Sequence, residues 1–303
     1  MQLKILNFFG NFSSPFLDRV VQFITMFGEE SLFIVVIVFL LWCFSKRKGF
    51  TLFSTLFSAL LAMGIIKAVV RYPRPFQVHP EIGAQRLSTA TGYSFPSGHS
   101  TGAASFYGSV ALAFKKQYLS IISALLIVLV ALSRLYLKVH WPLDVFGGVT
   151  LGLVASFVLY NRFETLYDDE KKLSTFSLGV GIGATTISLL LAILMAFANA
   201  DTLAFSDPMK LLALAGGGYL GFFLEFKKVK YTTDGSVGLK VVRFLIGLII
   251  LLAIQFSKAV VGDHFVTTFV RYWLVGFWAT FIYPFLGSKI RVSKESTLFS
   301  CQK

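Results

Sequence analysis

Apolar runs repeat along most of this chain, and several are long enough to cross a lipid bilayer. A helix needs about 20 mostly apolar residues to span about 30 Å of hydrocarbon. Hydrophobic residues make up 55% of the 303 residues, charged residues make up 14%, and the mean hydropathy is +0.73. Because hydrocarbon tolerates no unpaired backbone polar groups, we predict an all-α fold, a polytopic bundle of membrane helices.

Nine runs are candidate spans. The clearest cover residues 50–70, 119–137, 145–160, 177–198, 241–261 and 272–286, and the weaker ones cover residues 31–44, 101–114 and 211–226. The short run at 101–114 is counted because a basic pair follows it, and a re-entrant segment is the alternative. We therefore expect about nine transmembrane helices. Five belong to a core at residues 1–160, and four belong to an extension at 175–303, after a charged connection at 161–174.

Positive charge is concentrated in alternate connections between these runs. It comprises Lys46, Arg47, Lys48, Lys115, Lys116, Arg162, Lys171, Lys172, Lys227, Lys228, Lys230, Lys240, Arg243, Lys289, Arg291, Lys294 and Lys303, which are 17 of the 28 Lys and Arg residues. The positive-inside rule places these connections in the cytoplasm, with the N-terminus outside and the C-terminus inside. The charges form no soluble basic face, so we expect no nucleic-acid partner.

Several weaker signals fit a membrane protein without a cofactor. Residues 1–28 mix apolar and polar positions, as in an interfacial amphipathic helix, with a flexible tail as the alternative. Residues 1–11 have no apolar stretch of signal-peptide length, so we expect no cleaved leader. Cys43 lies in a span and Cys301 in the basic tail, which implies no disulfide framework. Residues 179–184 resemble a dinucleotide fingerprint but lack the preceding strand, so helix packing is the interpretation.

Three polar clusters lie between residues 67 and 144, at the ends of apolar runs. They read KAVVRYPRP (67–75), PSGH (96–99) and SRLYLKVHWPLD (133–144). The predicted topology places all three on the extracytoplasmic face. Ionisable groups at the membrane edge are costly to bury without a partner, so these clusters are the candidate functional site.

The first cluster supplies cations. Lys67 ends a long apolar helix, where a snorkelling lysine is the alternative interpretation. Arg74 follows seven residues later, and Pro73 and Pro75 hold the chain extended around it. Arg71 either contacts the substrate as well or is a solvated side chain. Lys67 and Arg74 are therefore expected to approach one anion from a helix end and from a fixed loop.

The second cluster begins a helix. Ser97 is a candidate N-cap, Gly98 permits close approach of the backbone, and the free amides of the first turn favour an anion such as a phosphate. His99 would lie at the edge of that phosphate, where a protonated imidazole can donate to a leaving oxygen. A purely structural histidine is the alternative.

The third cluster pairs a histidine with a carboxylate. Arg134 ends one span, Pro142 fits the first turn of the next, and Asp144 lies four residues after His140. This spacing lets Asp144 accept from one ring nitrogen while the other nitrogen faces a substrate. A metal site is the competing interpretation, but the clusters supply too few ligands for one.

In their order, the clusters resemble the type 2 phosphatidic acid phosphatase superfamily, whose K-x6-RP, PSGH and SR-x5-H-x3-D pattern is complete here over roughly residues 50–160. The resemblance implies a phosphatase without metal or cofactor. His140 would attack phosphorus to give a phosphohistidine, Asp144 would orient it, and His99 would protonate the leaving alcohol and then activate water. Lys67, Arg74 and Arg134, with Ser97 and the Gly98 amide, would hold the phosphoryl oxygens.

The resemblance also sets the substrate class. It implies a membrane lipid phosphate or pyrophosphate, such as phosphatidate, phosphatidylglycerophosphate, or an isoprenoid or sphingoid phosphate, in a bacterial cytoplasmic membrane. Family members limited to the core have six spans, and the longer chain is similar to the glucose-6-phosphatase and sphingosine-phosphate phosphatase branches. The alternatives are a lipid phosphotransferase using the same phosphohistidine, and a non-catalytic transporter or scaffold. The oligomeric state is open.

Overall fold

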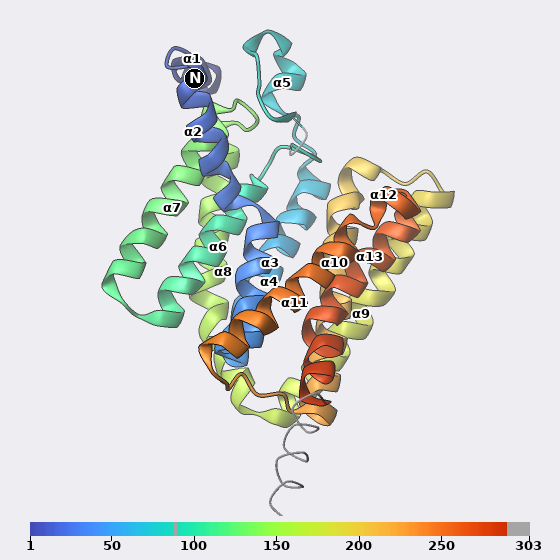
Figure 1. Ribbon diagram of the computed structural model, residues 1–303. Helices are drawn as coiled ribbons and strands as arrows, with labels where there is room; N and C mark the ends of the chain where they lie inside the picture. Colours follow the sequence, from blue (N-terminus) through green and yellow to red (C-terminus); the bar gives the residue numbers. More distant parts are fainter. Residues whose placement is uncertain (88–89, 290–303) are drawn as a thin grey trace, which may run out of the picture. The chain divides into compact units, whose positions relative to one another are not determined.

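The computed structural model describes residues 1–87 and 90–289, and all regular structure within them is helical. The chain folds as two compact units (Figure 1). Unit 1 comprises residues 1–36, 51–164 and 201–208, and unit 2 comprises residues 37–50, 165–200 and 209–303. The predicted tail positions Arg291, Lys294, Cys301 and Lys303 lie outside the described residues.

Unit 1 begins with short helices and continues into long ones. The short elements are α1 (Gln2–Gly10), α2 (Pro15–Thr25), η1 (Met26–Gly28), α3 (Glu30–Phe39), α5 (Pro75–Val78) and η3 (Pro80–Ile82). The long helices are α4 (Lys46–Val70), α6 (Gly98–Phe114), α7 (Gln117–Tyr136) and α8 (Pro142–Asp168). Residues 37–39 of α3, 46–50 of α4 and 165–168 of α8 belong to unit 2. The start of α10 (Thr202–Leu224) also belongs to this unit. The N-terminal residues expected to be an interfacial helix thus form two helices, α1 and α2.

Unit 2 contains most of the C-terminal extension. Its elements are η2 (Leu40–Phe44), α9 (Glu170–Phe197), the remainder of α10, η5 (Glu225–Val229), α11 (Val237–Phe256), α12 (Lys258–Val261), α13 (Phe265–Phe277) and η6 (Trp278–Ile282). The helix α13 packs against both α9 and α11. All four spans expected in the extension have a helix that is long and apolar enough to cross a membrane.

The expected count of nine spans is too high. Seven described helices meet the length and hydropathy of a span, and an eighth span arises if the pair Pro15–Gly28 and Glu30–Phe44, bent by 50°, crosses as one. The missing span is 101–114, which lies in α6. This helix has 17 residues and buries its small Ser, Gly and Ala side chains within unit 1. It therefore needs less hydropathy than a lipid-facing helix.

Small residues bring α6 and α8 into close contact. A Cβ atom at Gly148 would lie 2.6 Å from the Ser97 carbonyl oxygen, and one at Gly152 would collide with the Thr101 carbonyl oxygen. In unit 2, Gly217 and Gly221 pack in the same way against α13 and η6. Both glycine pairs therefore let helix backbones approach closely. In unit 1 this close approach fixes the start of α6 against α8, where two of the polar clusters meet.

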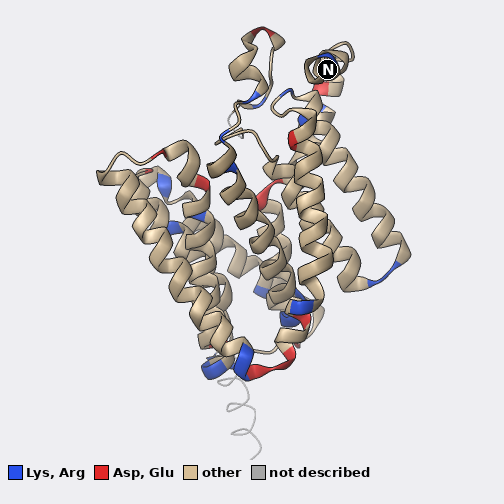
Figure 2. Ribbon diagram, turned by 180° about the vertical axis from the view of Figure 1, so that it is seen from behind, with Lys and Arg blue, Asp and Glu red and all other residues tan. Residues whose placement is uncertain are grey.

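The ends of the helices separate the polar clusters from a basic turn. Helices α6 and α7 form a hairpin joined by Lys115 and Lys116, and Figure 2 colours this connection blue. His99 lies in the first turn of α6 and Arg134 in the last turn of α7. The site residues are therefore at the opposite end of the hairpin from the basic turn.

Candidate active site

His140 and Asp144 meet where the chain enters α8. His140 Nδ1 lies 3.4 Å from Asp144 Oδ2, and both side chains are at most 2% exposed. The same carboxylate oxygen accepts from the Trp141 amide at 2.8 Å and from the Ser94 hydroxyl. Three donors therefore converge on Asp144 Oδ2, which holds it in place beside the imidazole.

Arg74 determines which nitrogen of His140 carries the proton. Its Nη1 lies 3.1 Å from His140 Nε2. An arginine is always a donor, so Nε2 must accept, and the neutral ring then carries its hydrogen on Nδ1, directed at Asp144. This leaves the Nε2 lone pair facing the cationic side of the site.

The surroundings of His140 keep the imidazole neutral. Burial in the connection between α7 and α8, together with the positive charges of Arg74, Lys67 and Arg134, holds the pKa of His140 well below its usual range. A buried cationic imidazole beside these groups would be costly. A neutral ring with Nε2 unprotonated is the form that can act as a nucleophile.

The main chain of residues 91–93 holds the two cations of the first cluster. Arg74 is extended, as predicted, and donates to the carbonyls of Gly92 (2.9 Å) and Thr91, and also to Val139 O at 3.0 Å. Lys67, in the last turn of α4, donates to the Tyr93 carbonyl. Both cations thus lie on the same short segment, which we call the carbonyl segment (Thr91–Tyr93).

The second cluster starts α6 beside Asp144. Ser97 is the N-cap, as predicted, and its Oγ accepts from the Ser100 amide at 3.4 Å. The Ser97 amide donates to the Asp144 main-chain oxygen at 2.9 Å, which ties this turn to α8. A Cβ at Gly98 would meet only Met63, at an ordinary 3.7 Å, so packing within the protein does not require glycine there.

Arg134 and His99 carry buried polar atoms without a partner. Arg134 Nη1 donates to Thr25 Oγ1 at 2.8 Å. Its Nε and Nη2, like His99 Nε2, have no hydrogen-bond partner among residues 1–87 and 90–289. Buried polar groups in folded proteins are nearly always paired, so these atoms are available to hydrogen-bond a ligand. Within the same described ranges, no three His, Cys, Asp or Glu residues are placed to hold a metal ion.

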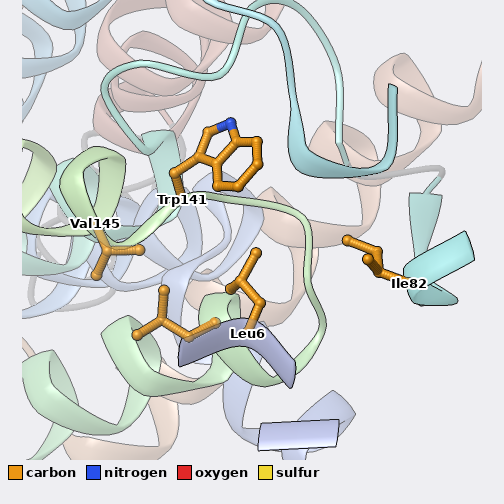
Figure 3. Close-up of a cluster of buried hydrophobic side chains, with 5 residues drawn as sticks. Leu6, Ile82, Trp141 and Val145 are labelled. Atoms are coloured by element: carbon orange, nitrogen blue, oxygen red, sulfur yellow. The ribbon is translucent and has the colours of Figure 1, made fainter. Parts of the chain in front are cut away.

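An apolar cluster anchors the connection that carries His140. Leu6, Ile82, Leu135, Trp141 and Val145 pack together, and Figure 3 shows Leu6 of α1 beside the side chains of Trp141 and Val145. The Trp141 indole also donates to Pro73 O at 3.0 Å, next to Arg74. Because Trp141 follows His140 directly, this packing restricts both His140 and its neighbour Arg74.

The loop before the PSGH turn makes several polar contacts of its own. His79 Nδ1 lies 3.0 Å from Glu81 Oε1. Arg86 donates to the Gln22 carbonyl at 2.7 Å and pairs with Glu29. Arg71 is half exposed, as the solvated interpretation expects. The loop is therefore held to the N-terminal helices.

The structure adds functional neighbours that the sequence did not indicate. They are Thr25, Glu29, Ser94, the carbonyls of the carbonyl segment, and two carboxylates at the start of α10, Asp201 and Asp207. A main-chain carbonyl has no residue type to reveal it. The two aspartates have no fixed spacing from the motifs.

Comparisons with known proteins agree with this site. The sequence matches the PAP2 superfamily over residues 48–168 and the transmembrane extension of PAP2 superfamily phosphatases over residues 209–295. It is 35% identical over 148 residues to an undecaprenyl-diphosphatase of Sulfolobus acidocaldarius, covering 47% of this chain and 68% of that protein. It is 32% identical over 158 residues to phosphatidylglycerophosphatase B of Bacillus subtilis, covering 48% and 74%.

Among solved structures, the transmembrane PAP2-type phosphatidylglycerolphosphate phosphatase of Bacillus subtilis is 28% identical, with a TM-score of 0.46 over 54% of this chain and 84% of that one. The family matches cover all three motif clusters and most of the C-terminal helices. The sequence relatives are matched over more than two thirds of their own length. The chain therefore belongs to the PAP2 superfamily of membrane lipid phosphatases and carries the transmembrane extension found in some of them.

Proposed function

We propose that this phosphatase hydrolyses lipid phosphomonoesters or pyrophosphates through a phosphohistidine formed on His140. The observation that supports this most strongly is the orientation of the His140 ring, with Nδ1 toward Asp144 and Nε2 toward Arg74 Nη1 at 3.1 Å. Electrostatic stabilisation and positioning do most of the work in phosphoryl transfer. The unpartnered donors of Arg134 supply further positive charge for the phosphoryl oxygens.

The first step forms the phosphoenzyme. His140 Nε2 attacks phosphorus while the bond from phosphorus to the leaving oxygen breaks, and His99 gives its proton to that oxygen. Lys67, Arg74 and Arg134 hold the phosphoryl oxygens, together with Ser97 and the Gly98 amide. Asp144 accepts a hydrogen bond from the Nδ1–H group and stabilises the positive charge that develops on the ring.

The second step releases phosphate. His99, now neutral, takes a proton from a water molecule, and the water oxygen attacks the phosphohistidine. The bond between phosphorus and Nε2 breaks, the ring returns to its neutral form, and His99 is protonated again for the next turnover. The same group therefore acts first as acid and then as base, and the step needs no metal.

The two relatives described above suggest two lipid classes as substrates. Their names point to an isoprenoid diphosphate, undecaprenyl diphosphate, and to phosphatidylglycerophosphate. Both present a terminal phosphate at the end of a lipid, which suits a cationic site at the ends of membrane helices. We propose that the core at 1–160, with its motifs in 67–144, supplies the chemistry, and that the extension at 175–303 follows the connection at 161–174.

We further propose a bacterial cytoplasmic membrane with the site on its extracytoplasmic face. In unit 2, ion pairs join three of the basic connections assigned to the cytoplasm. Lys46 pairs with the buried Glu225 at 2.8 Å, and Arg47 pairs with Asp168 at 2.7 Å. Figure 2 shows blue and red segments together at this end of the unit. These contacts support a common side for the connections.

Turnover by purified, detergent-solubilised protein in excess EDTA tests the proposal. We expect release of inorganic phosphate from undecaprenyl diphosphate or phosphatidylglycerophosphate, faster than from soluble phosphate esters. Activity that is lost in EDTA and restored by a divalent cation would contradict the metal-independent mechanism. If labelled phosphate instead appears on an added lipid or sugar acceptor, the protein is a phosphotransferase.

A further inference from the structure

The start of α10 contacts the carbonyl segment (Thr91–Tyr93) at each of its three residues. Thr91 Oγ1 donates to Asp207 Oδ2 at 2.8 Å, and the Tyr93 hydroxyl donates to Asp201 Oδ2 at 3.1 Å. Between them, Gly92 has a positive φ of 63°, and a Cβ there would lie 3.1 Å from the Leu203 carbonyl oxygen. Both partners belong to unit 1, so these contacts are part of one compact body.

The same three residues hold the phosphate-binding cations through their main chain. The Thr91 and Gly92 carbonyls accept from Arg74, and the Tyr93 carbonyl accepts from Lys67. Each residue of the segment thus faces α10 on one side and a cation on the other. Moving the segment would move both cations, because each donates to a carbonyl whose place α10 restrains.

Asp201 is itself rigidly held. Its Oδ1 accepts from the Leu203 and Ala204 amides at 3.0 and 3.2 Å, which caps α10. Its Oδ2 accepts from the Tyr93 hydroxyl and lies 3.8 Å from Arg71 Nη2. The hydrogen bond to Asp201 raises the pKa of the Tyr93 phenol, which keeps it protonated as a donor. The carboxylate therefore connects the first turn of α10 to the carbonyl segment in one fixed geometry.

We propose that Asp207 and Asp201 are positioning residues of the phosphatase site, which hold the carbonyl segment so that Arg74 and Lys67 are aimed at the phosphoryl group. The inference rests on the proposed phosphate-binding role of those two cations. It gives the start of α10 a role in catalysis, although the rest of this helix belongs to the transmembrane extension. Misplacing binding groups by about 1 Å can slow an enzyme by about 10²-fold.

The variants Asp207→Ala, Thr91→Val and the double variant test this proposal. We expect each single change to lower kcat/KM for the lipid phosphate about 10-fold and to raise the Ki of orthovanadate, a phosphate analogue, by a similar factor. The double variant should be no worse than Asp207→Ala alone, because that variant already lacks the Thr91 hydrogen bond. Asp207→Asn keeps an acceptor for Thr91 and should stay within about threefold of the original protein.

Asp263→Ala is the matched control. Asp263 accepts from the Thr268 hydroxyl at 2.9 Å beside the start of α13, in the same kind of contact but in unit 2. The kcat/KM and the vanadate Ki of the Asp263→Ala variant should not change. An Asp207→Ala variant with unchanged vanadate Ki, or single effects that multiply in the double variant, would overturn the inference even if the original enzyme is active. An original protein that releases no phosphate would instead overturn the proposed function.

Discussion

Replacing His140 with alanine is expected to abolish phosphate release, with kcat falling by about 10⁴-fold or more. Losses of this size follow when a covalent enzyme loses its nucleophile. His140 Nε2 is the nitrogen that faces Arg74, and His140 Nδ1 is paired with the Asp144 carboxylate. The measurement is phosphate release from the lipid substrate in detergent, under conditions where the original protein turns over.

Two further variants make this result interpretable. His140→Gln keeps a polar side chain beside Arg74 and Asp144, so it should fold and remain as inactive as His140→Ala. His264→Ala changes the N-cap residue of α13 and should retain activity. Melting temperature and size-exclusion profile report folding for all three. A folded His140 variant that retains activity would exclude this residue as the nucleophile.

The variant Arg74→Lys should lower kcat/KM by about 10²- to 10³-fold, the range found when one transition-state donor is removed. Arg74 is 2% exposed, and its guanidinium contacts three carbonyls and His140 Nε2 at once. A lysine keeps the charge but cannot reproduce the planar fork. Initial rates across a range of substrate concentrations measure this loss.

Arg47→Lys is the corresponding control. Arg47 donates to both carboxylate oxygens of Asp168, at 2.7 and 2.8 Å, in unit 2, so the same change removes a planar fork away from the site. The kcat/KM of the Arg47→Lys variant should be unaltered. Equal losses in the two variants would mean that Arg74 acts through general stability, and an unaltered Arg74→Lys enzyme would remove Arg74 from the phosphate-binding groups.

The location of the motif residues could be predicted because each lies where an apolar run ends. Lys67 is in the last turn of α4, Ser97 caps α6, Arg134 is in the last turn of α7, and Asp144 is in the first turn of α8. Hydropathy excludes such residues from the middle of a lipid-facing helix. The ends of these helices therefore follow from the sequence almost directly, and so does the meeting of His140 with Asp144 four residues later.

The groups that hold the cations could not be predicted in this way. Lys67 and Arg74 donate to main-chain oxygens of residues 91–93, and every residue type has such an oxygen. Asp207 lies 116 residues from its partner Thr91 in the sequence, so only tertiary structure reveals the pair. Spacing within a motif reports local geometry. It carries no information about which distant helix supports the loop.

The number of spans was overestimated for a related reason. A hydropathy argument treats each apolar run as facing lipid, whereas α6 is covered within unit 1 and packs against α7. The run at 31–44 was also counted alone, but α3 and η2 follow α2 and η1 at a bend of 50°. Burial and bending are tertiary properties, so a count from the sequence alone could not include them.

The most direct test of the account is to trap the phosphoenzyme. Substrate labelled with ³²P in its terminal phosphate is mixed with the protein, and the reaction is quenched in alkali, where phosphohistidine survives. The labelled peptide of the protein is then identified by mass spectrometry. We expect one phosphoryl group on His140, absent from His140→Gln and lost on longer incubation as inorganic phosphate appears. Label on a different residue, or turnover with no labelled protein at any time, would contradict a phosphohistidine mechanism at His140.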